Sequence, residues 1–121
     1  MKKKLTNKHL LVIGGTGFIG HNILKKAKIL KWNLSSVSRN KPKKNKIIKG
    51  VNYLKVDITK KSQIKRKLNL NFTHVINAAG NMNENFKKNN KKKIYQLYNL
   101  GPKNLIDFFL KKKIQNFIQL G

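Results

Sequence analysis

Short apolar runs alternate with helical patterns along this chain. Five runs are typical of short strands, because apolar and β-branched residues fill them and glycine or polar residues bound them. They are His9–Ile13, Leu34–Val37, Val51–Val56, His74–Ala78 and Phe117–Leu120. Strands that alternate with helices predict a parallel sheet with helices on its faces.

Three of the intervening stretches have helical spacing, namely Phe18–Lys31, Lys61–Leu68 and Lys88–Lys112. The apolar positions of the first are Ile19, Ile23, Ala27 and Leu30. Those of the last are Ile94, Leu97, Tyr98, Gly101, Leu105, Phe108 and Phe109. The link between the second and third strands has no helical period, so either a loop or a degenerate crossover is expected. We predict an α/β fold, a doubly wound parallel (Rossmann) sheet in the order 3-2-1-4-5.

Length and composition fit one domain spanning residues 1–121. The 121 residues are 39% hydrophobic, which is too many for a disordered chain and too few for a membrane protein. Cysteine is absent, which excludes a disulfide scaffold, a thiolate zinc site and a cysteine nucleophile. The apolar run after the basic start, Leu10–Ile13, is too short for a signal peptide, so a cytoplasmic protein with no membrane partner is expected.

The charge is extreme, with 29 basic and 3 acidic residues and a formal net charge of +26. The lysines are spread over the whole chain, and arginine, which favours bidentate phosphate contacts, occurs only at Arg39 and Arg66. Lysine, asparagine and isoleucine share AT-rich codons, so genome composition explains their excess together. We therefore expect a solvated lysine surface, weak salt-sensitive binding of polyanions and no specific nucleic-acid partner. A basic nucleic-acid-binding protein remains the less favoured alternative.

The strongest motif is Gly14-Gly15-Thr16-Gly17-Phe18-Ile19-Gly20, between the first strand and the first helix. Its spacing satisfies G-x-G-x-x-G through Gly15, Gly17 and Gly20, and G-x-x-G-x-x-G through Gly14, Gly17 and Gly20. A strand leads in and a helix leads out, which is the context that a dinucleotide site requires. The first glycine permits a tight turn, the middle one lets amides approach a pyrophosphate, and the last lets the helix lie close to the strand. The helix N-terminus then offers unsatisfied N–H groups to the anion.

Two further positions concern the nucleotide. Ser38-Arg39 follows the second strand, at the position where NAD-binding proteins carry a carboxylate for the ribose 2′-hydroxyl. A cation beside a small hydroxyl suits a 2′-phosphate instead, which favours NADP over NAD. The alternative is that Arg39 is one more surface cation. Asp57 follows the third strand, where it could accept a hydrogen bond from adenine or, equally, serve as a helix N-cap or turn residue before Thr59 and Ser62.

These residues together resemble a known family. The glycine turn, Asp57-Ile58-Thr59, Val75–Gly80, Asn99 and Gly101–Ile106 are similar in order and spacing to the extended short-chain dehydrogenase/reductase superfamily, in its NAD(P)-dependent nucleotide-sugar epimerase/dehydratase branch. The resemblance implies adenine contacts from Asp57 and Ile58 and a cofactor lining from the end of the fourth strand. With the positions above, the expected cofactor-binding residues are Gly14, Thr16, Gly17, Phe18, Ile19, Gly20, Ser38, Arg39, Asp57, Ile58, Ala78, Ala79, Gly80 and Asn99.

The chain departs from the family pattern at two places. Gly101-Pro102 stands where relatives have Gly-Thr, which predicts a kink around Tyr98–Pro102, because proline removes a helical hydrogen bond. No tyrosine is followed by lysine four residues later, and the family's acid/base Tyr-x-x-x-Lys pair would follow the fifth strand, where the chain ends. We therefore expect an incomplete domain, truncated after the fifth strand, with part of one sheet face uncovered, no catalytic residue and no activity of its own.

The resemblance also implies partners. The complete enzyme would act on a nucleotide sugar with NADP or NAD, and relatives pair the long helix with its copy in a homodimer. We expect most of that helix's apolar face to cover the sheet instead. A non-catalytic dinucleotide-binding module is the alternative function. The histidines, His9, His21 and His74, are isolated, so no metal site is predicted.

Overall fold

The computed structural model describes residues 7–79 and 91–120, and for residues 93, 94 and 97 the backbone alone. Its five strands form one parallel sheet in the order β3-β2-β1-β4-β5, which confirms the predicted fold class. The strands are β1 (His9–Ile13), β2 (Asn33–Ser38), β3 (Val51–Lys55), β4 (His74–Asn77) and β5 (Asn116–Gln119). Each predicted strand is present within one residue at either end.

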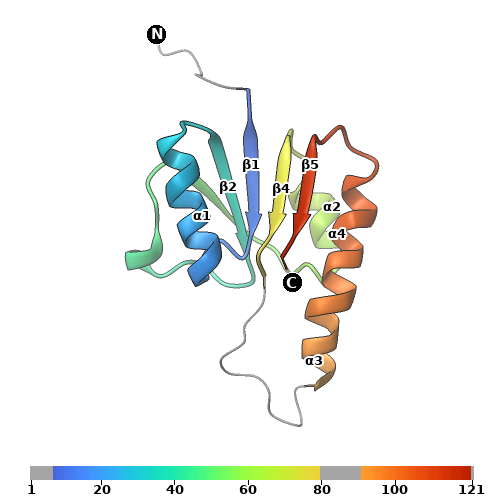
Figure 1. The fold of residues 1–121 in the computed structure, drawn as a ribbon. Helices are drawn as coiled ribbons and strands as arrows, with labels where there is room; N and C mark the ends of the chain where they lie inside the picture. Colours follow the sequence, from blue (N-terminus) through green and yellow to red (C-terminus); the bar gives the residue numbers. More distant parts are fainter. Residues whose placement is uncertain (1–6, 80–90, 121) are drawn as a thin grey trace.

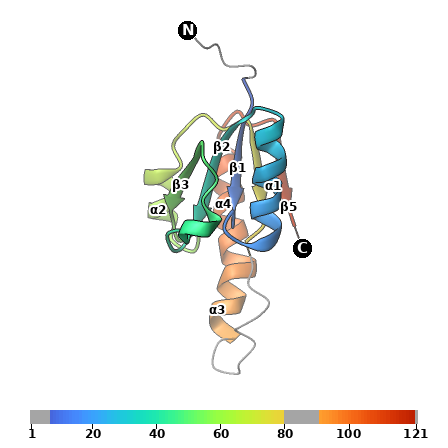
Figure 2. The same cartoon turned by 90° about the vertical axis from the view of Figure 1, so that its left-hand side faces the viewer.

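Helices lie on both faces of this sheet. They are α1 (Phe18–Ile29), α2 (Lys61–Lys67), α3 (Lys91–Tyr95) and α4 (Gly101–Phe109), with a π-helical segment, Gln96–Leu100, between the last two. Helix α1 covers one face, and α2 and α4 cover the other (Figures 1 and 2). The link from β2 to β3 is a loop with one 3₁₀ turn, Lys44–Lys46, so the loop was the correct alternative. None of the helices in residues 7–79 and 91–120 is long and apolar enough to span a bilayer.

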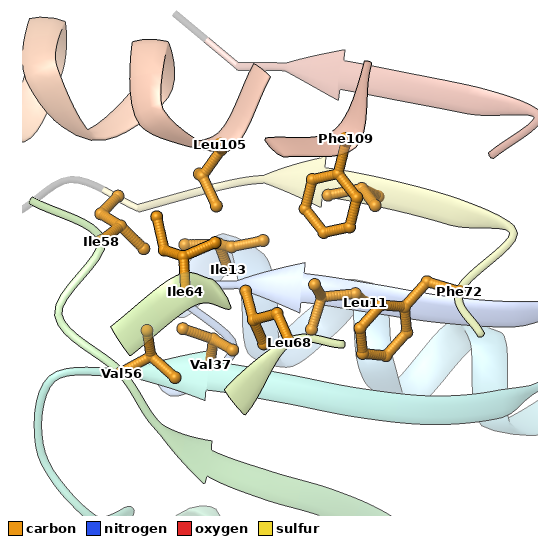
Figure 3. Close-up of a cluster of buried hydrophobic side chains, with 11 residues drawn as sticks. Leu11, Ile13, Val37, Val56, Ile58, Ile64, Leu68, Phe72, Leu105 and Phe109 are labelled. Atoms are coloured by element: carbon orange, nitrogen blue, oxygen red, sulfur yellow. The ribbon is translucent and has the colours of Figure 1, made fainter. Parts of the chain in front are cut away.

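The pleat of β1 divides the core in two. Leu11 and Ile13 face α2 and α4 in the larger cluster, where Leu105 and Phe109 of α4 pack over them (Figure 3). Leu10 and Val12 face α1 in the smaller cluster. All four β1 side chains are nearly inaccessible to water, and this burial on both faces is what a central parallel strand requires.

The apolar face predicted for α1 was partly wrong. Its buried positions are Gly20, Leu24 and Ala27, whereas Ile19 and Leu30 are 56% and 62% exposed. The helix is rotated in this way because Gly20 lies directly on the backbone of the preceding turn, which sets which side of the helix meets the sheet.

The kink predicted around Tyr98–Pro102 falls where the long helix changes type, from a π-helical segment to α4. The π-helical segment Gln96–Leu100 ends directly before Gly101, whose amide donates to the carbonyl of Gln96, five residues earlier. Pro102, the second residue of α4, has no amide to donate, so the helical hydrogen bonding is interrupted at this position. The predicted positions 88–90 lie outside the described residues.

The sheet is left partly open on the α1 side. Ile118 of β5 is 48% exposed on this face, and among the described residues no helix lies over β4 and β5 there (Figure 1). On the opposite face Phe117 packs against the larger cluster. An apolar sheet face was expected to be uncovered, and the described part of the chain has one.

Candidate functional site

The predicted site residues converge because the sheet is parallel. The carboxyl ends of all five strands point to one edge, at the bottom of Figure 1, where the segments that follow β1, β2, β3 and β4 meet. Ligands of open α/β sheets bind at this edge, beside the strand where the order of connections reverses. Here that strand is β1, which lies between β2 and β4.

The turn after β1 is tied to both neighbouring strands. The amide of Gly14 donates to the carbonyl of Val37 (2.7 Å), and the amide of Ala78 donates to the carbonyl of Ile13 (2.8 Å). Gly14 has a φ of +85° and lies so close to the end of β4 that a Cβ would stand 2.8 Å from the Cα of Ala79. A side chain is therefore excluded there by both conformation and space.

Gly17 and Gly20 have different roles in the turn. A Cβ on Gly20 would collide with the carbonyl group of Gly14, so this glycine lets α1 start against the strand. A Cβ on Gly17 would meet only the Gly14 carbonyl oxygen, at 3.4 Å, and would otherwise project into open space. Gly17 is thus free of a packing constraint, and its lack of a side chain keeps open the space in front of the helix.

The N-terminus of α1 is available to an anion. Gly17 is its N-cap and supplies no capping side chain, and the first turn contains no acidic residue. The first N–H groups of a helix have no intrahelical partner, and the helix dipole makes this end positive. Phe18 is 80% exposed beside this turn, and Thr16 within it is half-buried. An open glycine backbone before a 12-residue helix has the shape and charge that a pyrophosphate requires.

The second part of the site lies at the ends of β2 and β3. The amide of Val56 donates to the carbonyl of Ser38 (3.0 Å), which places Ser38 beside the segment that carries Asp57. The hydroxyl of Ser38 donates to the carbonyl of Asn40 (2.6 Å), while Arg39 is exposed. Ser38, Arg39 and Asp57 therefore lie close together at the β2–β3 end of this sheet edge.

Asp57 is a turn residue rather than a helix N-cap. Its Oδ1 accepts hydrogen bonds from the hydroxyl (2.6 Å) and amide (3.0 Å) of Thr59, whereas the N-cap of α2 is Lys60. Burial raises the pKa of Asp57, but the bonds from Thr59 and the charges of Arg39 and Lys60 outweigh it, so that the pKa is lowered from 3.8. The carboxylate is held ionised and oriented, which suits an acceptor for an adenine amino group.

The charge of Asp57 should make stability depend on pH. Its folded pKa lies below the unfolded value of 3.8, so its stabilising contribution is complete above that value and is lost as the pH falls through the folded pKa. We expect Asp57→Asn to lower the urea midpoint at about pH 6 and to match the wild type near about pH 2. A midpoint difference that is the same at both pH values would contradict this account.

Two buried amides that had no predicted role support the site. The first, Asn77 at the end of β4, is 1% exposed, and its Oδ1 accepts from the amide of Ala79 (3.1 Å). Its Nδ2 donates to Oε1 of Gln119 (2.8 Å), which joins the ends of β4 and β5. The sequence does carry a signal for this role, since Asn77 is a polar residue inside an apolar strand. A buried amide at such a position needs hydrogen-bond partners.

The second buried amide fixes helix α4 to the Asp57 turn. Asn104 is 2% exposed and its Nδ2 donates to the carbonyl of Ile58 (3.0 Å), while a Cβ on Gly101 would stand 2.7 Å from Cδ1 of Ile58. Ile58 itself is buried, so only its backbone could face a ligand. Asn99 is exposed in the π-helical segment and donates to the carbonyl of Tyr95 (3.1 Å). The predicted contact Gly80 lies outside the described residues.

The fold and this edge of the sheet define a dinucleotide-binding type of α/β domain. The model of the NAD dependent epimerase/dehydratase family matches residues 10–121, and the chain belongs to that family. No curated protein matches it. Among residues 7–79 and 91–120, no group of three or more histidine and carboxylate side chains could hold a metal ion.

Solved structures share the fold. The UDP-glucose 4-epimerase of Thermotoga maritima, solved with UDP-glucose, superposes with a TM-score of 0.82 at 18% identity, over 92% of this chain and 37% of its own. The UDP-glucose 4-epimerase of Thermus thermophilus, solved with NAD, gives 0.75 at 24% identity, over 85% and 34%. The enzyme WbmF of Bordetella bronchiseptica, in complex with NAD⁺, gives 0.79 at 19%, over 97% and 37%. The chain thus spans about a third of the length of these proteins.

Proposed function

We propose that the chain is the N-terminal dinucleotide-binding part of an enzyme that acts on a nucleotide sugar with NADP or NAD. The observation that carries the proposal is the glycine turn, where Gly17 leaves open space in front of the first amides of α1. Family membership supports a nicotinamide cofactor, and the structural neighbours solved with UDP-glucose and NAD support the substrate class. When bound, such a cofactor exchanges hydride with a substrate carbon.

The residues present fit the pyrophosphate and the adenine of a dinucleotide. The pyrophosphate would accept hydrogen bonds from the backbone amides of Phe18, Ile19 and Gly20, where no acidic side chain competes, since the amide of Gly17 already donates to the carbonyl of Gly14 (3.0 Å). The adenine would lie near Asp57 and the backbone of Ile58, at the ends of β2 and β3. Ala78 and Ala79 would line the path toward the nicotinamide without blocking it, because their side chains are small.

The end of β2 favours NADP in this proposal. The exposed guanidinium of Arg39 lies close enough to Asp57 to lower the pKa of that carboxyl, so it is at the adenosine end of the crevice. Neither Ser38 nor Arg39 is acidic, so this position holds no carboxylate that would repel a 2′-phosphate or bind a free 2′-hydroxyl. A guanidinium forms strong bidentate bonds with phosphate, and an NAD site gains nothing comparable from it.

A titration of the chain with NADPH and NADH at moderate salt tests the cofactor and its phosphate together. We expect NADPH to bind more tightly, and Arg39→Gln to weaken NADPH about tenfold, by loss of one charge-assisted hydrogen bond, with NADH unchanged. Lys41→Gln is the matched control, because it removes one exposed charge two residues away and should leave both affinities unchanged. Absence of binding by either nucleotide would overturn the proposed function, and equal binding would overturn the NADP preference.

A further inference from the structure

A second surface lies away from the dinucleotide crevice, between α2 and α4. The two helices contact each other on the same face of the sheet, and a groove of about 800 Å³ runs between them. Ile64 of α2 and Phe108 of α4 contribute its apolar lining. Leu110, just after α4, lines the same groove and is 78% exposed, so the groove offers an accessible apolar surface.

Lysines from α2 and from the segment that follows α4 line this groove. Lys61 and Lys65 come from α2, and Lys111 and Lys112 follow α4. The one acidic residue in the lining, Asp107, is paired with Lys103 at 2.9 Å. The groove therefore has an excess of positive charge that no described carboxylate offsets.

Lys61 and Lys111 both lie close enough to Asp107 for their charges to act on its carboxylate. The hydrogen bond from Lys103 lowers the pKa of Asp107 against the opposing effect of burial, and the charges of Lys61 and Lys111 lower it further. Lys61 is in α2 and Lys111 follows α4, so a lysine from each side of the groove lies near this carboxylate. A multiply charged anion in the groove would meet both at once, which dispersed surface lysines cannot offer.

One feature of the lining suits unpaired bases rather than a bare polyanion. The ammonium of Lys112 lies 5.1 Å from the centroid of the Phe108 ring and donates to Oδ1 of Asn69 (2.6 Å), so a cation is already held beside an aromatic surface.

We propose that the groove between α2 and α4 binds single-stranded RNA without sequence specificity. The lysines contact phosphates, the apolar lining accepts bases, and a strand can present both to the groove because its bases are unpaired. A duplex would present phosphates alone, and an acidic peptide would pair with the lysines but leave the aromatic surface of Phe108 unused. The site is separate from the dinucleotide crevice, so it does not rest on the proposed function.

The test is fluorescence anisotropy with a labelled oligoadenylate of about 12 nucleotides. The groove variant is Lys65→Gln with Lys111→Gln, and the control is Lys25→Gln with Lys28→Gln on the exposed side of α1, so that each loses two charges. Two lost phosphate contacts, at a salt slope of about 0.7 each, should weaken binding about 25-fold at about 0.1 M salt. The control should weaken it less than about threefold, since its lysines lie outside the groove.

The alternatives give different results. Equal losses in the two double variants would mean that dispersed charge binds the strand and would overturn the proposal. Equal competition by inorganic polyphosphate, or by an oligoglutamate of the same charge, would show that bases play no part and would also overturn it. Displacement of the RNA by NADPH would place the strand in the crevice instead. RNA binding that persists in saturating NADPH, with the groove variant alone defective, is the expected result.

Discussion

Gly20→Ala is expected to destabilise the domain severely. An alanine Cβ at this position would collide with the carbonyl group of Gly14 and stand 2.9 Å from the Cα of Gly15. Both neighbours are backbone atoms of a turn that hydrogen bonds hold to β2, so they cannot move aside as a flexible side chain could. Overpacking of this kind costs about 3 kcal/mol, which is a large part of the stability of a small domain. Urea unfolding followed by circular dichroism would measure it.

The control for this prediction is Gly50→Ala. Gly50 has a φ of +92°, and no atom lies within 4 Å of the position that a Cβ would take, so alanine there meets backbone strain without a collision. That strain costs about 1 kcal/mol. If Gly20→Ala were no more destabilising than Gly50→Ala, the close approach of α1 to the turn would not be the constraint that the structure indicates.

The sheet could be predicted from the sequence because its signals are local. Each strand is a short apolar run bounded by glycine or polar residues, and strand order follows from the handedness of the connections. The orientation of α1 could not be predicted in this way. Its helical period was visible, but the close contact of Gly20 with Gly14 decides which side is buried, and that contact is tertiary. The helical spacing alone therefore placed Ile19 and Leu30 on the apolar face, although both are exposed in the structure.

The part of the site that a local motif determines could be predicted from the sequence. The part that depends on hydrogen bonds between side chains and distant elements could not. The spacing of the glycines in the turn indicates what each one does, so separate roles could be predicted for Gly14, Gly17 and Gly20. The amides of Asn77 and Asn104 could not, because their partners lie 42 and 46 residues away. The sequence shows only that each asparagine stands within an apolar segment. That position indicates a buried amide in need of partners, but the partners are identified only once the fold is known.

Gly17→Ala is expected to separate nucleotide binding from folding. Gly17 has φ −78° and ψ 174°, which any residue adopts, and the added Cβ would meet only an ordinary contact at 3.4 Å. The structural cost is the poorer N-cap that alanine makes, about 1 kcal/mol or less. The functional cost is larger, because the Cβ would occupy the space in front of the first amides of α1, where the pyrophosphate is proposed to lie.

Loss of about two charge-assisted hydrogen bonds, near 1.5 kcal/mol each, corresponds to an NADPH affinity about 100-fold weaker. Titration gives the affinity and thermal unfolding gives the stability of the same sample. Gly17→Ala should therefore stay folded and lose binding, whereas Gly20→Ala should lose binding only as far as it unfolds. Wild-type affinity in a folded Gly17→Ala chain would show that no phosphate approaches this turn, and the dinucleotide assignment would then have no anion site to rest on.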